Sequence, residues 1–193
     1  MSRVCKIILI CEGWRDSAFA RGFLAAAGID RRSVEPKTNQ GGSGHDWVKT
    51  QFVVEVANLG KFAEGRGVLG LLDEDGQGVV QREQEIADRL RMSGLPPLVA
   101  HEGRCLLLPT RNIETWIYWL TGQRHGPPVT VDETTDYKKA GPPSGASRIG
   151  NEQCRPAGEH LHTLNHTNLP VGCPSMLGVS HRRMRDFLTA VRR

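Results

Sequence analysis

Two aspartates separated by one residue, Asp73 and Asp75, are the side chains best placed to do chemistry. They directly follow an apolar run at residues 69–72, in the sequence LGLLDEDG. An apolar run that ends in acidic residues is typical of a buried strand that stops where charge is needed. Because strand side chains alternate between faces, we expect both aspartates to point the same way, about 7 Å apart at ~3.3 Å rise per residue. Carboxylates this close repel, and they either share a proton or bind a divalent cation such as Mg²⁺. An acidic turn that caps the next helix is the alternative interpretation.

The size and composition of the chain favour one intracellular domain. Its 193 residues suffice for a single well-packed core with a small appendage. Lys and Arg number 25 against 21 Asp and Glu, a formal charge of +4 that is compatible with a polyanionic partner. The five cysteines show no C-x-x-C spacing, which indicates a reducing cytoplasm. We find no signal peptide and no apolar run near ~18 residues, so we expect a cytoplasmic protein without a membrane partner.

The order of apolar and amphipathic segments predicts an α/β fold. Strands are expected at residues 4–11, 33–39, 67–72 and 104–108, and helices at 14–27, 46–62, 79–92 and 113–120. A short extra strand is expected at 97–101. This alternation is typical of a Rossmann-like parallel sheet of about four strands with helices on both faces.

The chain changes character after Gly122. Gly and Pro residues punctuate a long polar stretch, in which we expect little regular structure, and a final helix is predicted at about 180–193. The inner face of that helix should carry Met184, Phe187, Leu188 and Val191. We therefore predict a catalytic domain at 1–122 and a C-terminal extension at 123–193 that packs on it.

Parallel sheets bind ligands beyond the carboxyl ends of their strands. Glu12 follows the first predicted strand, and Asp73 and Asp75 follow the third, so we expect the three side chains to meet at that edge. Lys37 and His45 flank a glycine-rich loop at residues 40–44 near the same edge. Asn112 is expected to be the N-cap of the next helix, whose first turn carries Glu114.

This arrangement resembles the Toprim domain of topoisomerases, bacterial primases, small ribonucleases and OLD-family nucleases. The likeness covers about residues 4–122 and rests on Cys11-Glu12-Gly13 and on the Asp73-Glu74-Asp75-Gly76 motif with the strands before them. In that family the acidic residues bind Mg²⁺ or Mn²⁺ for phosphoryl transfer on nucleic acid. The resemblance implies that Asp73 and Asp75 are metal ligands and that Glu12 is a ligand or a general base.

A second segment, LPTRNIETW at residues 108–116, resembles the P-x-x-x-I-E-x-W element of stand-alone Toprim-like proteins found beside ATPases in bacterial defence loci. The resemblance implies that Glu114 lies near the metal and that the chain is an anti-phage nuclease that acts on DNA or RNA. It also implies a companion ATPase. Because a nuclease that is always active would harm its host, we hypothesise that this partner restrains it. Residues after Tyr137 match no pattern of the family.

The chemistry implied is metal-assisted hydrolysis of a phosphodiester, in which a cation activates water and neutralises the leaving oxygen. Lys138, Lys139 or Arg111 would offset the negative charge that develops on the phosphate. The commoner role of a lysine is a solvated surface charge. Both roles stay open for these residues.

Three other functions compete with a nuclease. The D-x-D-G sequence also resembles haloacid-dehalogenase phosphatases, but there it follows the first strand, and Glu12 would have no role. A calcium loop is excluded because Gln84 stands where a bidentate Glu is required. A non-catalytic subunit that binds nucleic acid or docks on an ATPase stays open, although buried like charges are costly to keep without a cation.

Two further features have an ordinary and a functional interpretation. A zinc site could form from cysteines and histidines whose spacing fits no standard ligand pattern, namely Cys154, His160, His162, His166 and Cys173. Trp116 and Trp119 lie at helical spacing and are expected in the core rather than as platforms for bases.

Overall fold

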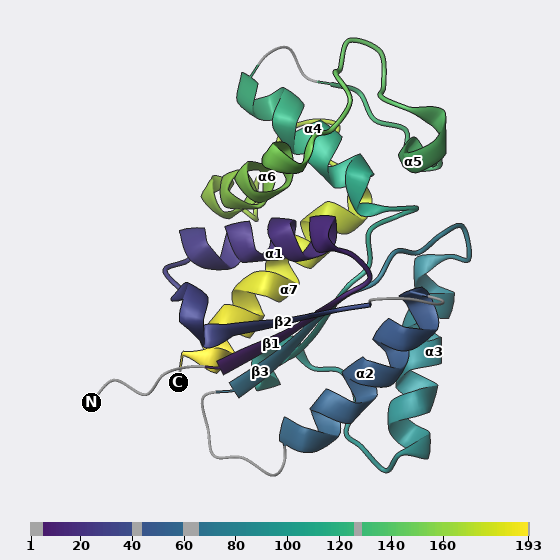
Figure 1. Cartoon of the computed structure of the whole chain (residues 1–193), viewed down its shortest axis with the longest axis vertical. Coiled ribbons are helices and arrows are strands. Elements are labelled where there is room, and N and C mark those ends of the chain that lie inside the picture. Colours follow the sequence, from purple (N-terminus) through teal and green to yellow (C-terminus); the bar gives the residue numbers. More distant parts are fainter. Residues whose placement is uncertain (1–5, 40–43, 60–65, 126–128, 193) are drawn as a thin grey trace.

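A four-stranded parallel sheet forms the centre of the fold, which we describe from a computed structural model of residues 6–39, 44–59, 66–125 and 129–192 (Figure 1). The strand order is β2-β1-β3-β4. The strands are β1 (Lys6–Cys11), β2 (Val34–Thr38), β3 (Arg66–Leu71) and β4 (Arg104–Leu107). The helices are α1 (Trp14–Ala26), α2 (Gly44–Leu59), α3 (Val79–Met92), α4 (Ile113–His125), α5 (Tyr137–Ala140), α6 (Asn151–Thr163) and α7 (Ser175–Val191). The predicted parallel sheet of four strands flanked by helices is confirmed.

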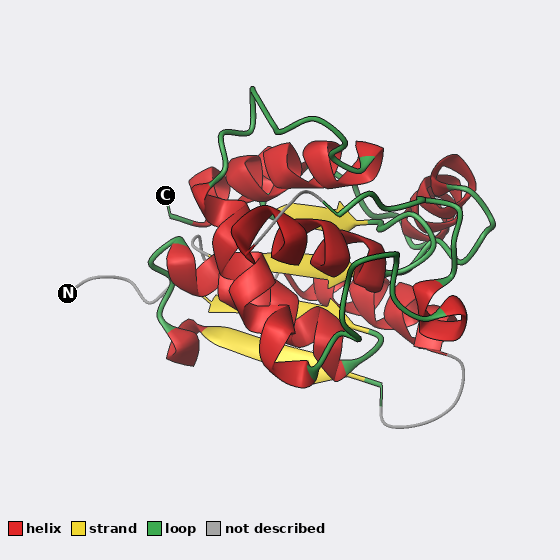
Figure 2. Ribbon diagram, turned by 90° about the horizontal axis from the view of Figure 1, so that it is seen from above, coloured by secondary structure: helices red, strands yellow, loops and turns green. Residues whose placement is uncertain are grey.

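Helices cover both faces of the sheet, which explains why its strands read as continuous apolar runs (Figures 1 and 2). Along β1, Ile7 and Leu9 enter a core shared with α1, α4, α6 and α7. Ile10 enters a separate core with α2 and α3. The alternation of the strand thus supplies two cores from one short segment. Pro36 lies on the edge strand β2, where a missing N–H is tolerated.

Several predicted helices have different ends in the structure. Helix α4 continues to His125, and α7 begins at Ser175 rather than near residue 180. Helix α2 begins at Gly44, and residues 60–62 of the predicted helix lie outside the described ranges. The predicted inner face of α7 (Met184, Phe187, Leu188 and Val191) is buried, and so are Trp116 and Trp119, which confirms both predictions.

The expected strand at 97–101 is wrong. Residues 95–99 have no regular structure, and Ala100–Glu102 form a 3₁₀ turn. Pro96 and Pro97 lack the N–H groups that a strand would donate to its neighbour, which favours an irregular path here.

The prediction of sparse regular structure after Gly122 is also wrong, because helix α6 packs tightly against α1 (Figure 1). The sequence around Pro156 and Gly158 reads as helix-breaking, but the glycines allow a close crossing of two helices. A Cβ added to Gly158 would lie 1.9 Å from the carbonyl oxygen of Phe19, and one added to Gly22 would lie 2.1 Å from that of Arg155. No side chain fits at either position.

Within the part of the chain that the structure covers, every helix is either too short or too polar to cross a bilayer.

The close crossing of α1 and α6 gives a test of the fold. We expect Gly158→Ala to lower the free energy of unfolding by about 1–3 kcal/mol, because the methyl group overpacks a backbone contact. Gly178→Ala in α7 is the matched control: its added Cβ would meet only the flexible end of Leu169, at 3.2 Å. We expect that variant to change stability by at most about 1 kcal/mol. Urea unfolding measures both, and equal effects would contradict the close crossing.

Candidate functional site

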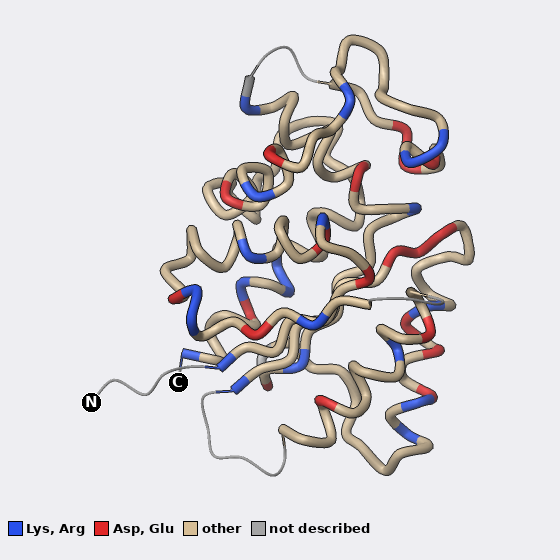
Figure 3. The backbone as a smooth tube through the Cα atoms, in the orientation of Figure 1, with Lys and Arg blue, Asp and Glu red and all other residues tan. Residues whose placement is uncertain are grey.

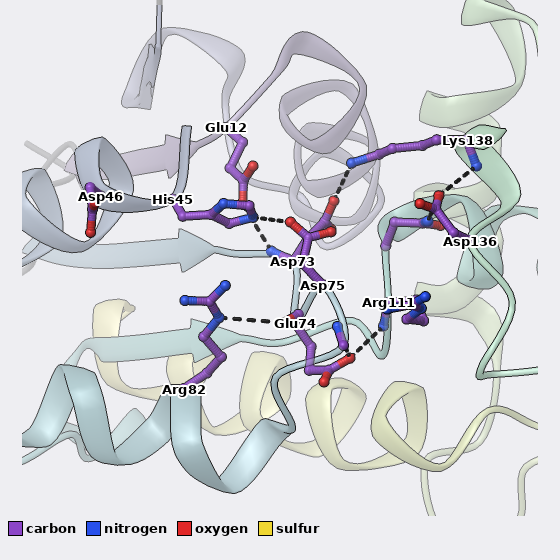
Figure 4. A network of polar contacts seen from close by, with 12 residues as sticks. Glu12, His45, Asp46, Asp73, Glu74, Asp75, Arg82, Arg111, Asp136 and Lys138 are labelled. Carbon is purple, nitrogen blue, oxygen red and sulfur yellow. Dashed lines mark hydrogen bonds and ion pairs between the residues drawn. The ribbon is translucent and has the colours of Figure 1, made fainter. Parts of the chain in front are cut away.

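Four carboxylates gather where the central strands end, and we call Glu12, Asp16, Asp73 and Glu114 the acidic cluster. Figure 4 labels two of them, Glu12 and Asp73. Glu12 follows β1, and Asp73 follows β3 by two residues. Asp16 and Glu114 lie in the first turns of α1 and α4. The backbone N–H of Asp73 donates to Glu12 Oε1 at 3.2 Å. Three of the expected acidic residues therefore meet at the carboxyl edge of the sheet, together with Asp16, which our sequence analysis missed.

Burial makes this cluster electrostatically costly. Asp73 is 1% exposed and Glu114 3% exposed. Burial, followed by the charge of Asp73, raises the pKa of Glu12 to about 7. Burial likewise raises the pKa of Asp16 to about 7, and burial with the Asp16 charge raises the pKa of Asp73 well above its ordinary value. Raised carboxylate pKa values mean that the surroundings supply too little positive charge to the ionised cluster.

Two cationic side chains neutralise part of the cluster. The ammonium of Lys138, from helix α5, contacts Asp73 Oδ2, and Arg15 Nη1 lies 2.9 Å from Glu114 Oε1. Burial alone would lower the pKa of Lys138, but the Asp73 carboxylate, with Glu114 and Asp16, raises it. Glu114 Oε2 is buried and has no hydrogen-bond partner among the described residues. The predicted residue Lys138 thus reaches the site, although it binds an acidic residue there.

Asp73 also fixes the start of helix α4. Its Oδ1 accepts a hydrogen bond from the backbone N–H of Ile113 at 3.1 Å. A carboxylate is stabilised at this end of a helix by the free N–H groups and the helix dipole. The expected N-cap, Asn112, instead donates from its side chain to Asp136 at 3.0 Å, and its own oxygen has no partner in the described part of the chain. Asn112 thus lies directly before α4, as predicted for its N-cap, but its side chain does not cap the helix.

Asp75 occupies a different environment from Asp73. Strand β3 ends at Leu71, and Asp75 lies in a turn with a left-handed φ of 53°. The side chain of Asp75 is 37% exposed and contacts His45 Nε2. The strand geometry expected for this pair is wrong, because both aspartates lie beyond the strand and the turn gives them different partners.

His45 connects Asp75 to the acidic cluster (Figure 4). Its Nε2 lies 3.2 Å from Glu12 Oε1 and also contacts Asp75. Burial lowers the pKa of His45 despite the opposing charge of Asp75. Lys37, the other basic residue expected near this edge, instead pairs with Glu55 at 2.6 Å. Residues 40–43 of the glycine-rich loop lie outside the described residues.

Glu74, between the two aspartates, holds the loops of the site together. Its carboxylate accepts hydrogen bonds from the backbone N–H groups of Gly76 at 3.0 Å and Arg111 at 3.1 Å, and also from that of Gly78. Burial alone would raise the pKa of Glu74, but these N–H groups and the Arg111 charge lower it. The loop after β3 is thereby fixed to the loop after β4. Figure 3 shows this acidic loop as a continuous red stretch.

The side chain of Arg111 contacts the C-terminal extension. Its Nε donates to the Thr134 carbonyl at 3.0 Å, and its backbone has a left-handed φ of 62°. Together with Asp75, it is one of two described non-glycine residues with positive φ. Such backbone strain is concentrated at functional sites, where the surrounding structure compensates for it.

The residue types of the acidic cluster are suitable ligands for Mg²⁺ or Mn²⁺, but their present positions do not form a metal site. Carboxylate oxygens are suitable ligands, the cluster lacks positive charge, and Glu114 has an unpartnered buried oxygen. However, among the described residues no group of three or more His, Cys, Asp or Glu could hold a metal ion as they stand. Lys138 contacts Asp73 where a bound cation would be expected. A metal ion at Asp73 would therefore have to share that carboxylate with Lys138 or displace it.

The suggested zinc ligands do not form a metal site in the described structure. The Cys154 thiol is 3.8 Å from the Gly150 carbonyl oxygen, and burial raises its pKa to about 11. The ring of His162 packs edge-on against Phe23, with centroids 5.3 Å apart. These contacts are those of core residues.

A comparison with models of protein families finds no match, and searches of curated proteins and of solved structures also find none. The Toprim resemblance therefore remains a prediction.

The raised pKa of Asp16 predicts an unusual pH dependence. Folded Asp16 keeps its proton up to about pH 7, whereas the unfolded chain releases it near the ordinary value of 3.8. Its contribution to stability is thus present at acid pH and is lost as the pH rises through 7. We expect the free energy of unfolding of Asp16→Asn to fall less between pH 5 and pH 8 than that of the wild type. Urea unfolding across this range provides the measurement.

Asp30→Asn is the matched control for this experiment. Asp30 is exposed, and it accepts a backbone hydrogen bond from Arg32 at 2.8 Å, which an amide oxygen can also accept. A control variant that flattened the profile as much as Asp16→Asn would contradict the assignment.

Proposed function

We propose that this chain is a Mg²⁺- or Mn²⁺-dependent nuclease that hydrolyses phosphodiester bonds of DNA or RNA. The observation that carries the proposal is the buried acidic cluster, whose negative charge is only partly neutralised, at the edge where parallel sheets bind ligands. Glu12, Asp73 and Glu114 would hold the metal. Asp75 would lie near it, because His45 contacts both Asp75 and Glu12. The metal would supply charge neutralisation and an activated water.

The residues around the cluster support this role in distinct ways. Asp16 accepts the backbone N–H of Gly13 at 2.9 Å, so its carboxylate fixes the turn that follows Glu12. Glu74 fixes the loops that carry Asp73 and Asp75. Lys138 neutralises Asp73, and its ammonium is close enough to the cluster to contact a phosphate oxygen there. These contacts support a cation site with a positive side chain beside it.

A non-catalytic binding subunit is the second candidate function. The ion pairs of Lys138 and Arg15 already neutralise Asp73 and Glu114 in part, which reduces the need for a metal. A phosphatase of the haloacid-dehalogenase type has less support. Asp73 would be its nucleophile, yet both carboxylate oxygens are engaged, one by Lys138 and one by the Ile113 N–H.

The biological setting rests on the Toprim resemblance alone. We propose a cytoplasmic effector of a bacterial anti-phage defence system that a companion ATPase restrains. Co-purification of the native complex would test this partner, and a chain that is active alone would contradict the restraint.

Removal of the central carboxylate should abolish metal binding and cleavage together. We expect Asp73→Asn to reduce cleavage of plasmid, single-stranded DNA or tRNA at least about 100-fold, because metal-derived charge stabilisation contributes several kcal/mol. Calorimetric titration with Mn²⁺ should show a parallel loss of affinity. Asp46→Asn, at a side chain that is 66% exposed, is the matched control and should retain both properties.

The outcomes separate the two candidate functions. Cleavage that persists in Asp73→Asn would point to another active site. A wild-type protein that binds nucleic acid but neither binds Mn²⁺ nor cleaves any substrate would favour the binding subunit.

A further inference from the structure

A pocket of about 220 Å³ lies directly beside the acidic cluster. We call it the basic pocket, because four cationic side chains line it: Arg15, Lys138, Lys139 and Arg148. Glu114 of the acidic cluster lines the same pocket. Its lining residues come from α1 and α4 and from α5 with the segment that leads to α6. The C-terminal extension thus supplies most of the positive charge.

Three of these cations already have carboxylate partners, and one does not. Arg15 pairs with Glu114, Lys138 with Asp73, and Lys139 with Asp136 at 3.2 Å. Arg148 is exposed and makes no ion pair or hydrogen bond with any described residue. Its guanidinium is therefore available to an anion in the pocket.

The residue next to Arg148 is buried and contacts helix α4. Ile149 is buried, and its N–H donates to the hydroxyl of Tyr118 at 3.4 Å. The Tyr118 ring packs edge-on against Tyr137, with centroids 5.4 Å apart, and the Tyr137 hydroxyl accepts the N–H of Asp132 at 2.7 Å. These contacts hold the Arg148 backbone at the rim of the pocket while its side chain stays unpartnered. A guanidinium in such a position is suited to bidentate binding of phosphate.

We propose that the basic pocket binds a backbone phosphate of a single-stranded nucleic acid, next to the phosphate that is cleaved, and that Arg148 contacts it. This inference rests on the proposed nuclease function. Lys138 and Arg15 line the pocket and also reach the acidic cluster, so a phosphate bound here lies beside the candidate metal site. The pocket is smaller than the about 300–1,000 Å³ that holds a drug-sized ligand. We expect a pocket of this size to take one sugar-phosphate unit, and a duplex to be too wide to enter it.

The salt dependence of binding tests the pocket without relying on cleavage. The full chain is titrated with a fluorescein-labelled single-stranded 12-mer in EDTA, and fluorescence anisotropy is read between 50 and 200 mM KCl. Each phosphate contact to a single strand contributes about 0.7 to the slope of log K against log salt, so Arg148→Gln should lower that slope by about 0.7. The wild type should therefore lose about 2.6-fold more affinity than the variant over this fourfold range, since 4 raised to the power 0.7 is about 2.6.

Arg182→Gln is the matched control. Arg182 lies in α7 outside the pocket, is exposed, and likewise makes no ion pair or hydrogen bond with the described residues. We expect its slope to equal that of the wild type. An unchanged slope in Arg148→Gln, or an equal decrease in both variants, would overturn the proposal. If Arg148→Gln lowered the slope for duplex DNA as much as for the single strand, the assignment to a single strand would be overturned.

Two additional arms identify the ligand and separate this inference from the proposed nuclease function. A nucleoside monophosphate should compete with the strand more strongly in the wild type than in Arg148→Gln. If citrate, a carboxylate, competed and the nucleoside monophosphate did not, the phosphate assignment would be overturned. If Arg148-dependent binding occurs while Mn²⁺ supports no cleavage, the pocket stands and the nuclease proposal fails. If cleavage occurs with an unchanged Arg148→Gln slope, the nuclease stands and the pocket fails.

Discussion

The repulsion among four close carboxylates, three of them buried, is the interaction on which the site depends. Strands β1 and β3 are neighbours in the sheet, so Glu12 and Asp73 must come close once the strands pair. The first turns of α1 and α4 add Asp16 and Glu114 to the same place. Because helices cover both faces of the sheet, solvent neutralises little of this charge. The surrounding protein, or a bound cation, has to compensate for it.

The C-terminal extension provides much of that compensation. Lys138 comes from α5, and Asp136 at the start of α5 accepts the side chain of Asn112, just before α4. Arg111 reaches the Thr134 carbonyl, and Glu74 fixes Arg111 in turn. The extension is thus joined to the two loops that carry the predicted acidic residues. Residues after Gly122 take part in the site as well as in the core, which a motif search confined to the first part of the chain does not reveal.

The sequence predicts the sheet well because each central strand must be apolar on both faces, and no other element gives such short continuous runs. Helix α3 has the predicted bounds because its charged and apolar positions separate clearly. Helix α6 could not be predicted in this way. Gly158 and Pro156 ordinarily interrupt helices, and only the position of Phe19 in the folded chain explains the glycine.

The candidate site was predictable in part for a similar reason. Glu12, Asp73 and Glu114 each follow a strand or open a helix, so their meeting follows from topology. Asp16 lies in the first turn of a helix, where acidic residues are common for reasons unrelated to function. The partners of Asp73 and Asp75 could not be predicted, because they depend on backbone dihedrals. Asp75 lies in a left-handed turn, so the two side chains do not follow the alternation of a strand.

Lys138 is the more exposed of the two cations that contact the acidic cluster, at 44% against 37% for Arg15. The carboxylates are tied to strand ends and helix starts, whereas Lys138 extends on a flexible four-carbon stem from a helix of four residues and is 44% exposed. Tyr137 anchors that helix separately, through its hydroxyl and its contact with Tyr118. Rotation of the Lys138 side chain would therefore free Asp73 without moving its backbone. Such an exchange would let a divalent cation take over the neutralisation of the cluster while the ammonium turns toward the basic pocket, where an incoming phosphate would need it.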